Sequence, residues 1–288
     1  MSERVVVAID GGAASDSAID WAIDRAAVIG AHLEILTIVD VHWTRPSGAD
    51  PGLAAHERVV FEAGQRVAAS GICPHWSTTV HHDRVVPGLV AATRRAELVV
   101  MGSHKPVHAV GSIHGTLPLV VAARAVSPIV VVPAGWTRNA GPVVIGVDDR
   151  SGTAAMHFAA AEADRAHTTL VAVRAYDVPP IVARAWGTAD EPLRRAESLQ
   201  LIMLDSMLSA VRRDRGQLEI AATVARGRPA LVLAEHAKDA SLTVVGRHAS
   251  DGTAQARLGP VAHDLLMNLP SPVAVVPERS TPPRRRAL

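Results

Sequence analysis

The residues best suited to bind a ligand lie in a polar loop between two apolar runs, "GSHKPVHAVGSIHGT", at residues 102–116. A strand, a glycine-containing turn and a helix start direct backbone N–H groups and a partial positive charge at one point, which favours a phosphate. Gly102, Gly115 and Thr116 would supply the backbone and hydroxyl part of such a site. Lys105 could reach a phosphate with its ammonium group, or point into solvent. The loop therefore indicates a candidate phosphate site.

A second copy of this loop, "GRHASDGTAQARLGP", occupies residues 246–260. Gly246 and Gly259 take the places of Gly102 and Gly115, but Pro260 stands where the first loop has a threonine. Proline removes both a backbone N–H group and a side-chain hydroxyl from the helix start. Because proline is otherwise favourable at the first helical position, the second loop indicates a helix start without a ligand.

The repeat extends over the whole chain and defines the elements that must position both loops. "RVVVAIDGG" near the start aligns with "PVVIGVDD" from Pro142, so that Asp10 matches Asp148. Short β-branched runs alternate with segments of helical period, which predicts parallel strands joined by helical crossovers. The strands expected in the first copy are Val5–Ile9, Leu33–Val39, Thr78–His81, Leu98–Met101 and Ile129–Val132. The apolar helical stripe expected in the second copy is Leu193, Ala196, Met203, Leu204, Met207, Leu208 and Val211.

This alternation predicts an α/β protein with two tandem doubly wound, Rossmann-like domains, each with five parallel strands and helices on both faces. The predicted boundaries give a first domain at 1–135, a linker at 136–141, a second domain at 142–278 and a disordered basic tail at 279–288. Ligands of such folds bind beyond the carboxyl ends of the strands, where the winding direction reverses. That rule selects the turn at Asp10, the end of the second strand near Val39, and the loop after the fourth strand.

The segments "VVVAIDGGAASDSAIDWA", "VVPGLVAATRRAELVVMGSH" and "GTLPLVVAARAVSPIVVVP" resemble the universal stress protein family, and the second copy repeats the same landmarks. The resemblance covers nearly the whole chain apart from the tail. It implies a tandem member in which two family domains face each other, and such chains often pair again into a homodimer.

ATP-binding members of that family place an aspartate after strand one near the nucleoside and carry a loop of the form G-x-x-G-x9-G-[S/T] after strand four. The resemblance thus implies that Asp10 bonds the ribose or adenine and that backbone near Val39 contacts the base. Lys105 stands where the pattern has its second glycine; in the second copy Ala249 replaces that glycine and Pro260 the hydroxyl residue. ATP, with or without Mg²⁺, is therefore expected in the first domain, and binding at Asp148, Gly246 and Gly259 is expected to be weaker.

Each of these residues also has a purely structural interpretation. A glycine can end a strand, and a threonine can cap a helix. Asp10 and Asp148 can cap their own turns through their side chains.

The amino-acid composition restricts which binding partners and which cellular compartment are expected. Lys and Arg number 29 against 28 Asp and Glu, so the overall charge gives no reason to expect nucleic acid or an acidic membrane as partner. No apolar run approaches the length of a membrane-spanning helix. The single cysteine, Cys73, suits a reducing compartment and is expected to be a small buried residue. We therefore expect a cytoplasmic protein.

Metal binding and catalysis have little support in the sequence. His104, His108 and His114 lie in the first loop, but they form no known ligand spacing and no carboxylate accompanies them there. No nucleophile elbow or P-loop lysine motif is present, and we find no carboxylates paired at a fixed catalytic spacing within a loop. We expect no metal site and, if ATP binds, slow hydrolysis at most.

Two functions from different classes follow. The first is a stress-response type adenine-nucleotide-binding module, in which ATP in the N-terminal domain acts as a regulatory ligand. The alternative is a nucleotide-free scaffold or dimerisation protein with degenerate loops in both domains. For a homodimer of tandem chains, exposed apolar last strands would offer a route to pairing.

Overall fold

The computed structural model describes residues 3–40, 51–106, 116–149, 152–178, 190–247 and 258–278, with only the backbone described at 51–52, 104–106 and 190. The N-terminal domain consists of β1 (Arg4–Ala8), α1 (Ala13–Ile29), β2 (His32–Asp40), α2 (Pro51–Ser70), β3 (Trp76–Asp83), α3 (Val85–Ala92), β4 (Leu98–Pro106), α4 (Leu117–Arg124) and β5 (Ile129–Ala134). The C-terminal domain consists of β6 (Val143–Gly146), α5 (Thr153–Arg165), β7 (Leu170–Tyr176), α7 (Asp190–Asp214), β8 (Ile220–Arg226), α8 (Pro229–His236), β9 (Leu242–Arg247), α9 (Pro260–Asn268) and β10 (Val273–Pro277).

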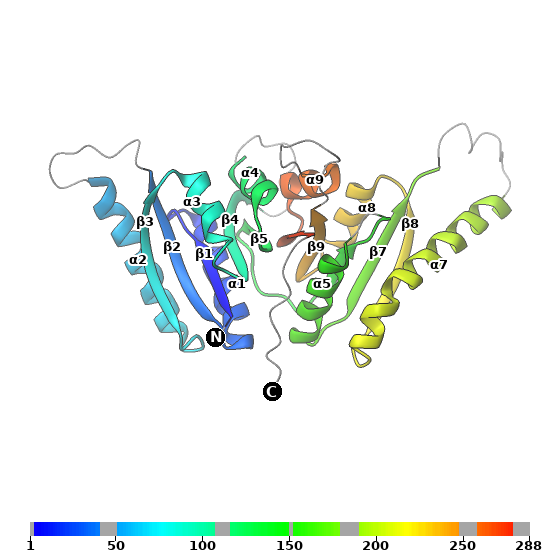
Figure 1. The fold of residues 1–288 in the computed structure, drawn as a ribbon, viewed down its shortest axis with the longest axis horizontal. Coiled ribbons are helices and arrows are strands. Elements are labelled where there is room, and N and C mark those ends of the chain that lie inside the picture. The colour runs from blue at the N-terminus through cyan, green and yellow to red at the C-terminus, as the bar shows by residue number, and fades with distance from the viewer. Residues whose placement is uncertain are drawn as a thin grey trace.

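The strands form one sheet in the order β3-β2-β1-β4-β5-β10-β9-β6-β7-β8. Within each domain the paired strands run parallel, and the chain winds outward from β1 or β6 before it crosses to the other side. Helices cover both faces, and the two domains diverge from the centre like the arms of a V (Figure 1). The prediction of two doubly wound parallel domains is confirmed.

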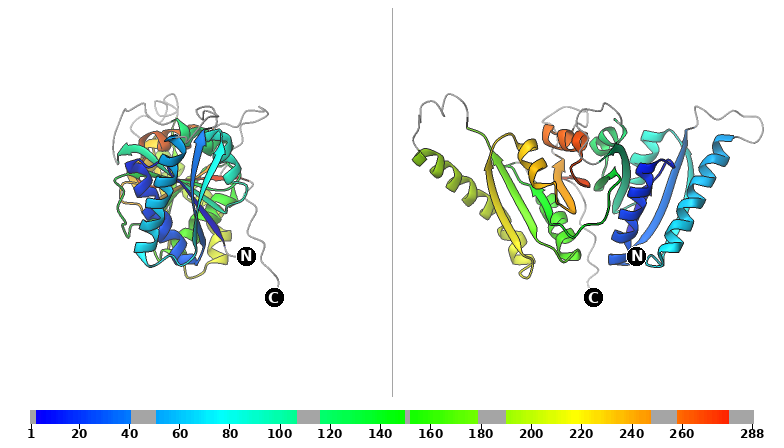
Figure 2. Two further views of the ribbon diagram at one scale, coloured as in Figure 1. Left: turned by 90° about the vertical axis from the view of Figure 1, so that its left-hand side faces the viewer. Right: turned by 180° about the vertical axis from the view of Figure 1, so that it is seen from behind.

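Alternation along the buried strands supplies a core on each face of the sheet. Val5 and Val7 point toward α1 and α2, whereas Val6 points toward α3 and α4. In the C-terminal domain α5 and α7 cover the first of these faces, and α8 and α9 cover the second. Figure 2 shows this layering from the side and from behind.

The strand β4 runs past its predicted end. The sequence predicts a strand that stops at Met101, but β4 continues to Pro106, with a register shift against β5 between Ser103 and Pro106. Proline cannot donate a ladder hydrogen bond, which is why it occurs at edges and bulges. Lys105 therefore belongs to an irregular strand end, where a loop was expected.

The two domains join through β5 and β10, which pair antiparallel. Val131 pairs with Val273 and Ile129 with Val275, and each of these residues is at most 1% exposed. The expectation that the last strands offer exposed edges to another chain is wrong, because each strand serves as the other's partner inside one chain.

Charged side chains reinforce this junction. Glu162 of α5 is 5% exposed and accepts a hydrogen bond of 2.9 Å from Arg25 Nη2 of α1 and one of 2.7 Å from Arg165 Nη1. Arg138 of the connecting segment pairs with Asp24 of α1. Because a buried carboxylate needs such partners, separating the domains would remove Arg25 and leave Glu162 with Arg165 of its own helix.

Arg247, at the end of β9, crosses to the N-terminal domain and caps a helix there. Its Nη1 donates to the carbonyl oxygens of Ala122, Ala123 and Ala125, at 3.3, 2.9 and 2.7 Å, where α4 ends. Burial lowers the pKa of Arg247, and the negative charge of Glu278 opposes that shift. A cation at this position satisfies carbonyl groups that have no partner within the helix.

Replacing Arg247 by methionine is expected to lower the free energy of unfolding by about 2 kcal/mol, because hydrogen bonds from a charged donor to buried carbonyl groups are lost. Urea unfolding followed by circular dichroism measures the change. The exposed Arg124 in the last turn of the same helix is the control, and Arg124→Met is expected to change stability by less than about 0.5 kcal/mol. Equal effects of the two substitutions would contradict the capping role.

Candidate functional site

The residues predicted for the first site lie at the carboxyl edge of the N-terminal domain. Asp10 follows β1, Val39 lies near the end of β2, and Gly102 lies in β4. The strand β1 sits between β2 and β4, so these positions flank the point where the winding direction reverses. Thr116 immediately precedes α4, the helix that follows β4. The topology therefore brings the predicted positions to the edge where this fold binds ligands.

The carboxylate of Asp10 stabilises its own turn. Its Oδ1 accepts hydrogen bonds from the Gly12 N–H group at 2.9 Å and from the Ser15 hydroxyl at 2.8 Å, and the Ser15 Oγ accepts from the Asp10 N–H group at 3.0 Å. The turn places Gly11 at φ +82°, a conformation that glycine adopts most easily. The expected turn-capping role of Asp10 is confirmed, while its contact with a nucleoside stays a prediction.

Gly102 has a packing role as well. A Cβ atom at this position would lie 2.3 Å from the carbonyl oxygen of Ala14, in the first turn of α1. No side chain fits where β4 and the backbone of α1 approach so closely. The glycine is therefore required by the fold whether or not a phosphate binds beside it.

Thr116 differs from these two residues. It is exposed at the N-cap position of α4, and within the described chain its side chain makes no capping hydrogen bond to that helix. The structural interpretation of Thr116 as a helix cap is therefore wrong. Its hydroxyl stands at the start of a helix whose first N–H groups have no partner one turn earlier.

Other predicted residues are described only partly or lie outside the described residues. Lys105 and His104 are described in the backbone alone, whereas Gly115, His108, His114, Ala249 and the basic tail lie outside. Among the side chains that are described, no three of the types His, Cys, Asp and Glu group closely enough to hold a metal ion. Cys73 is 5% exposed, and burial raises the pKa of its thiol, which confirms the expectation of a buried residue.

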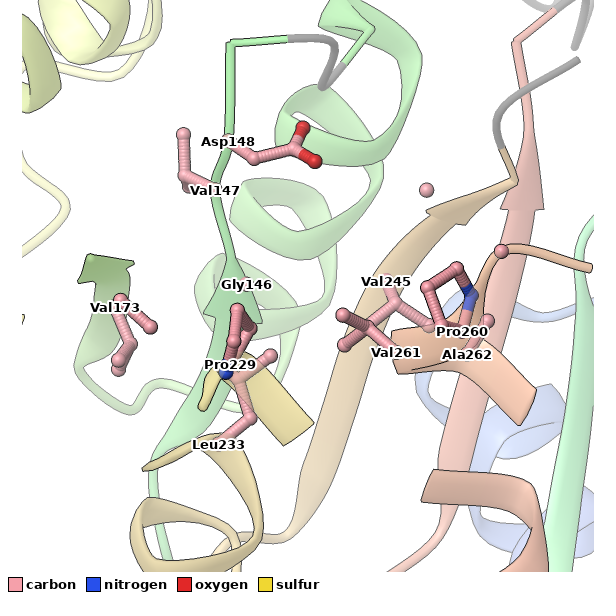
Figure 3. Close-up of a pocket in the computed structure, with 13 residues that line it drawn as sticks. Gly146, Val147, Asp148, Val173, Pro229, Leu233, Val245, Pro260, Val261 and Ala262 are labelled. Carbon is pink, nitrogen blue, oxygen red and sulfur yellow. The ribbon is translucent and has the colours of Figure 1, made fainter. Parts of the chain in front are cut away.

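In the C-terminal domain Asp148, Gly246 and Gly259 line one hollow of about 80 Å³. Figure 3 shows Asp148 at its rim, with Val173, Pro229 and Leu233 to one side and Val245, Pro260 and Val261 to the other. A space of this size holds a few water molecules. The structure thus brings together the three residues predicted for the weaker site.

The chemistry of this hollow differs from that of a polyphosphate site. The charged residue among its described lining is Asp148, and the rest of that lining is apolar or glycine. Helix α9 begins at Pro260 directly after Gly259, so its first helical residue has no N–H group. The missing N–H group removes one donor that a phosphate would use at this helix start.

One buried charged residue near the turn of Asp148 was not predicted from the sequence. Arg174 of β7 is 5% exposed and donates to Asp149 Oδ1 at 2.5 Å and to Gln200 Oε1 of α7 at 2.6 Å. It thereby fixes the residue next to Asp148. The sequence feature that could have indicated this residue is the arginine inside the apolar run "LVAVRAY". A guanidinium group buried in such a strand must have hydrogen-bond partners.

Comparison with known proteins agrees with these landmarks. The model of the universal stress protein family matches residues 1–133 and again 140–277. A universal stress protein of Mycobacterium tuberculosis is 28% identical over 299 residues, covering 94% of each chain. One of Mycolicibacterium smegmatis is 28% identical over 299 residues, covering 96% of this chain and 97% of its own.

Solved structures share the fold. The crystal structure of a universal stress protein from Archaeoglobus fulgidus superimposes with a TM-score of 0.71 at 16% identity, and the match covers 96% of this chain and 99% of that one. Within the described ranges, no helix has the length and apolar character needed to cross a membrane. The chain belongs to the universal stress protein family and carries two of its domains in tandem.

Proposed function

We propose that this chain is a regulatory adenine-nucleotide-binding module and that ATP, with or without Mg²⁺, binds at the carboxyl edge of the N-terminal domain. The observation that carries the proposal is Thr116, an exposed hydroxyl that leaves its own helix uncapped at the ligand-binding edge of the fold. There it can donate to a phosphate oxygen beside the N–H groups of Leu117 and Leu119, Pro118 between them having none.

The contrast between the domains supports the assignment to the N-terminal one. The first loop has Lys105 and Thr116 where the second has Ala249 and Pro260, so a cationic group and a hydroxyl donor are both lost in the second copy. The carboxylate of Asp148 does not distinguish the two sites, because Asp10 holds the equivalent position in the first domain. Since ATP is strongly anionic, these differences favour the first domain by charge and by hydrogen-bonding capacity.

We propose that the bound nucleotide regulates the protein and that the chain has not evolved to hydrolyse it. Helix α4 follows directly after its N-cap residue Thr116 and ends at the carbonyl groups that Arg247 of the other domain caps. A ligand at the start of α4 would therefore act on a helix whose other end forms part of the domain junction. We also propose a cytoplasmic setting, which the single buried thiol of Cys73 suits.

A second candidate function is a scaffold that binds no nucleotide. The hydrogen bonds of Asp10 and the contact of Gly102 with Ala14 favour it, because both explain family landmarks by folding alone. The irregular strand end at Pro106 favours it too, because it changes the backbone where the family pattern has a second glycine.

Amine labelling tests the proposal directly, because the chain has two lysines, Lys105 and Lys238. ATP bound at the first site is expected to slow acetylation of Lys105 at least fivefold, since its ammonium would be engaged with phosphate. Lys238 is the internal control. It is exposed at the end of α8, pairs with Glu235 at 2.5 Å, and should label at the same rate with and without ATP.

Mass spectrometry of the labelled peptides gives both rates in one sample. Equal labelling of Lys105 at zero and millimolar ATP, together with no saturable ATP binding in native mass spectra, would rule out the nucleotide proposal and leave the scaffold. Adenosine in place of ATP should protect Lys105 poorly, because it lacks phosphates.

Asparagine substitutions separate the two domains. Asp10→Asn keeps an oxygen that can accept the turn hydrogen bonds but removes the charge, and we expect ATP affinity to fall about tenfold, or about 1.4 kcal/mol. Asp148→Asn should change it less than about twofold. Isothermal titration calorimetry measures both, with thermal unfolding as the check on folding, and equal losses would contradict the assignment to the N-terminal domain.

A further inference from the structure

Helix α7 has a second apolar face that points away from the core. Leu204, Leu208 and Val211 are at most 1% exposed and bury the inner face of the helix. Leu199, Ile202 and Met203 lie at spacing i, i+3, i+4 on the opposite side and are 55%, 65% and 42% exposed. The prediction that Met203 belongs to the buried stripe is wrong.

The fold does not require this apolar face. In the N-terminal domain α2 holds the equivalent position, between β2 and β3, and Figure 1 shows α2 and α7 at the two outer flanks. The exposed side of α2 carries an ion pair between Arg58 and Glu62, with Phe61 as its large exposed apolar residue. The outer face of α7 also carries ion pairs, between Glu191 and Arg194 and between Asp205 and Arg212, but between them it exposes a cluster of three large apolar side chains where α2 exposes one, which indicates a partner surface.

We propose that two copies of this chain associate through the outer faces of α7, packed antiparallel about a twofold axis at Ile202. The two copies cannot pair through their last strands, because β5 and β10 already pair with each other within each chain. The proposal does not depend on nucleotide binding.

The sequence of α7 is self-complementary in this arrangement. Glu191 and Arg213 lie equally far from Ile202 on either side, about 16 Å along the helix axis. Both side chains are exposed, and Glu191 lies 3.6 Å from Arg194 on its own helix. An antiparallel pair places Glu191 of each copy opposite Arg213 of the other, twice by symmetry, whereas a parallel pair would oppose like charges.

The central contact is apolar and closely packed. Ile202 would meet its own copy on the axis, and Leu199 would pack against Met203 of the other chain. Ser198 and Ser206 lie one turn to either side of Ile202 and, being small, allow the helices to approach.

The size of the contact sets the expected affinity. A helix of 25 residues is about 37 Å long and about 10 Å wide, so the pair would bury on the order of 750 Å² in total. Interfaces below about 1,200 Å² belong to the weak, transient class. We therefore expect a dissociation constant in the micromolar range.

Sedimentation velocity of the full chain between about 1 and 200 μM tests the proposal. The wild type should shift from monomer to dimer over this range, and Ile202→Asp should weaken dimerisation at least tenfold, because it places a charge on the twofold axis. Phe61→Asp makes the same chemical change on α2 and should leave the dissociation constant within twofold of wild type. Thermal unfolding confirms that both variants fold.

A charge exchange tests the antiparallel register. Glu191→Arg and Arg213→Glu should each weaken the dimer about threefold to tenfold, and the double variant should return to within twofold of wild type. A wild type that stays monomeric at 200 μM, a dimer insensitive to Ile202→Asp, or a double variant without recovery would overturn the proposal. Binding of α7 to anionic vesicles by a chain that stays monomeric would also overturn it and assign the face to lipid.

Discussion

The antiparallel pairing of β5 with β10 is the interaction on which the rest of the structure depends. It joins two five-stranded sheets into one and buries valine and isoleucine side chains that would otherwise form an exposed, aggregation-prone edge. It also brings α4 and α9 into contact beside the centre, as Figure 1 shows. Because both helices follow the candidate loops, the junction holds the starts of these two helices in neighbouring parts of the structure.

This proximity gives a physical route between the domains. Arg247 directly follows Gly246 of the second loop. Its guanidinium group donates hydrogen bonds to the last carbonyl groups of α4, the helix that follows Thr116 of the first loop. A change in either loop would act on the same short helix. Coupling between the two loops through α4 needs no movement of a whole domain, because the hydrogen bonds that cap the C-terminal end of α4 come from Arg247 of the other domain.

The sequence was sufficient for the fold but not for the junction or the roles of the site residues. Two periodicities and a whole-chain repeat predicted alternating strands and helices. An apolar strand run such as "SPIVVVP" looks the same whether its partner strand lies in the same chain or in another, so the exposed edge was inferred wrongly. The sequence around Asp10 likewise fits a turn cap and a ligand contact equally. The hydrogen bonds of Asp10 with Gly12 and Ser15 depend on the three-dimensional path of the turn, which the sequence pattern does not specify.

Family landmarks do not carry equal weight for ligand binding once their structural roles are known. Gly102 is fixed by its contact with Ala14, and Pro260 is a favourable helix start, so both would be retained by a domain that binds nothing. The Thr116 side chain, by contrast, makes no capping hydrogen bond to α4 within the described residues. Thr116 is therefore the described landmark of the first loop for which its own helix gives no structural role.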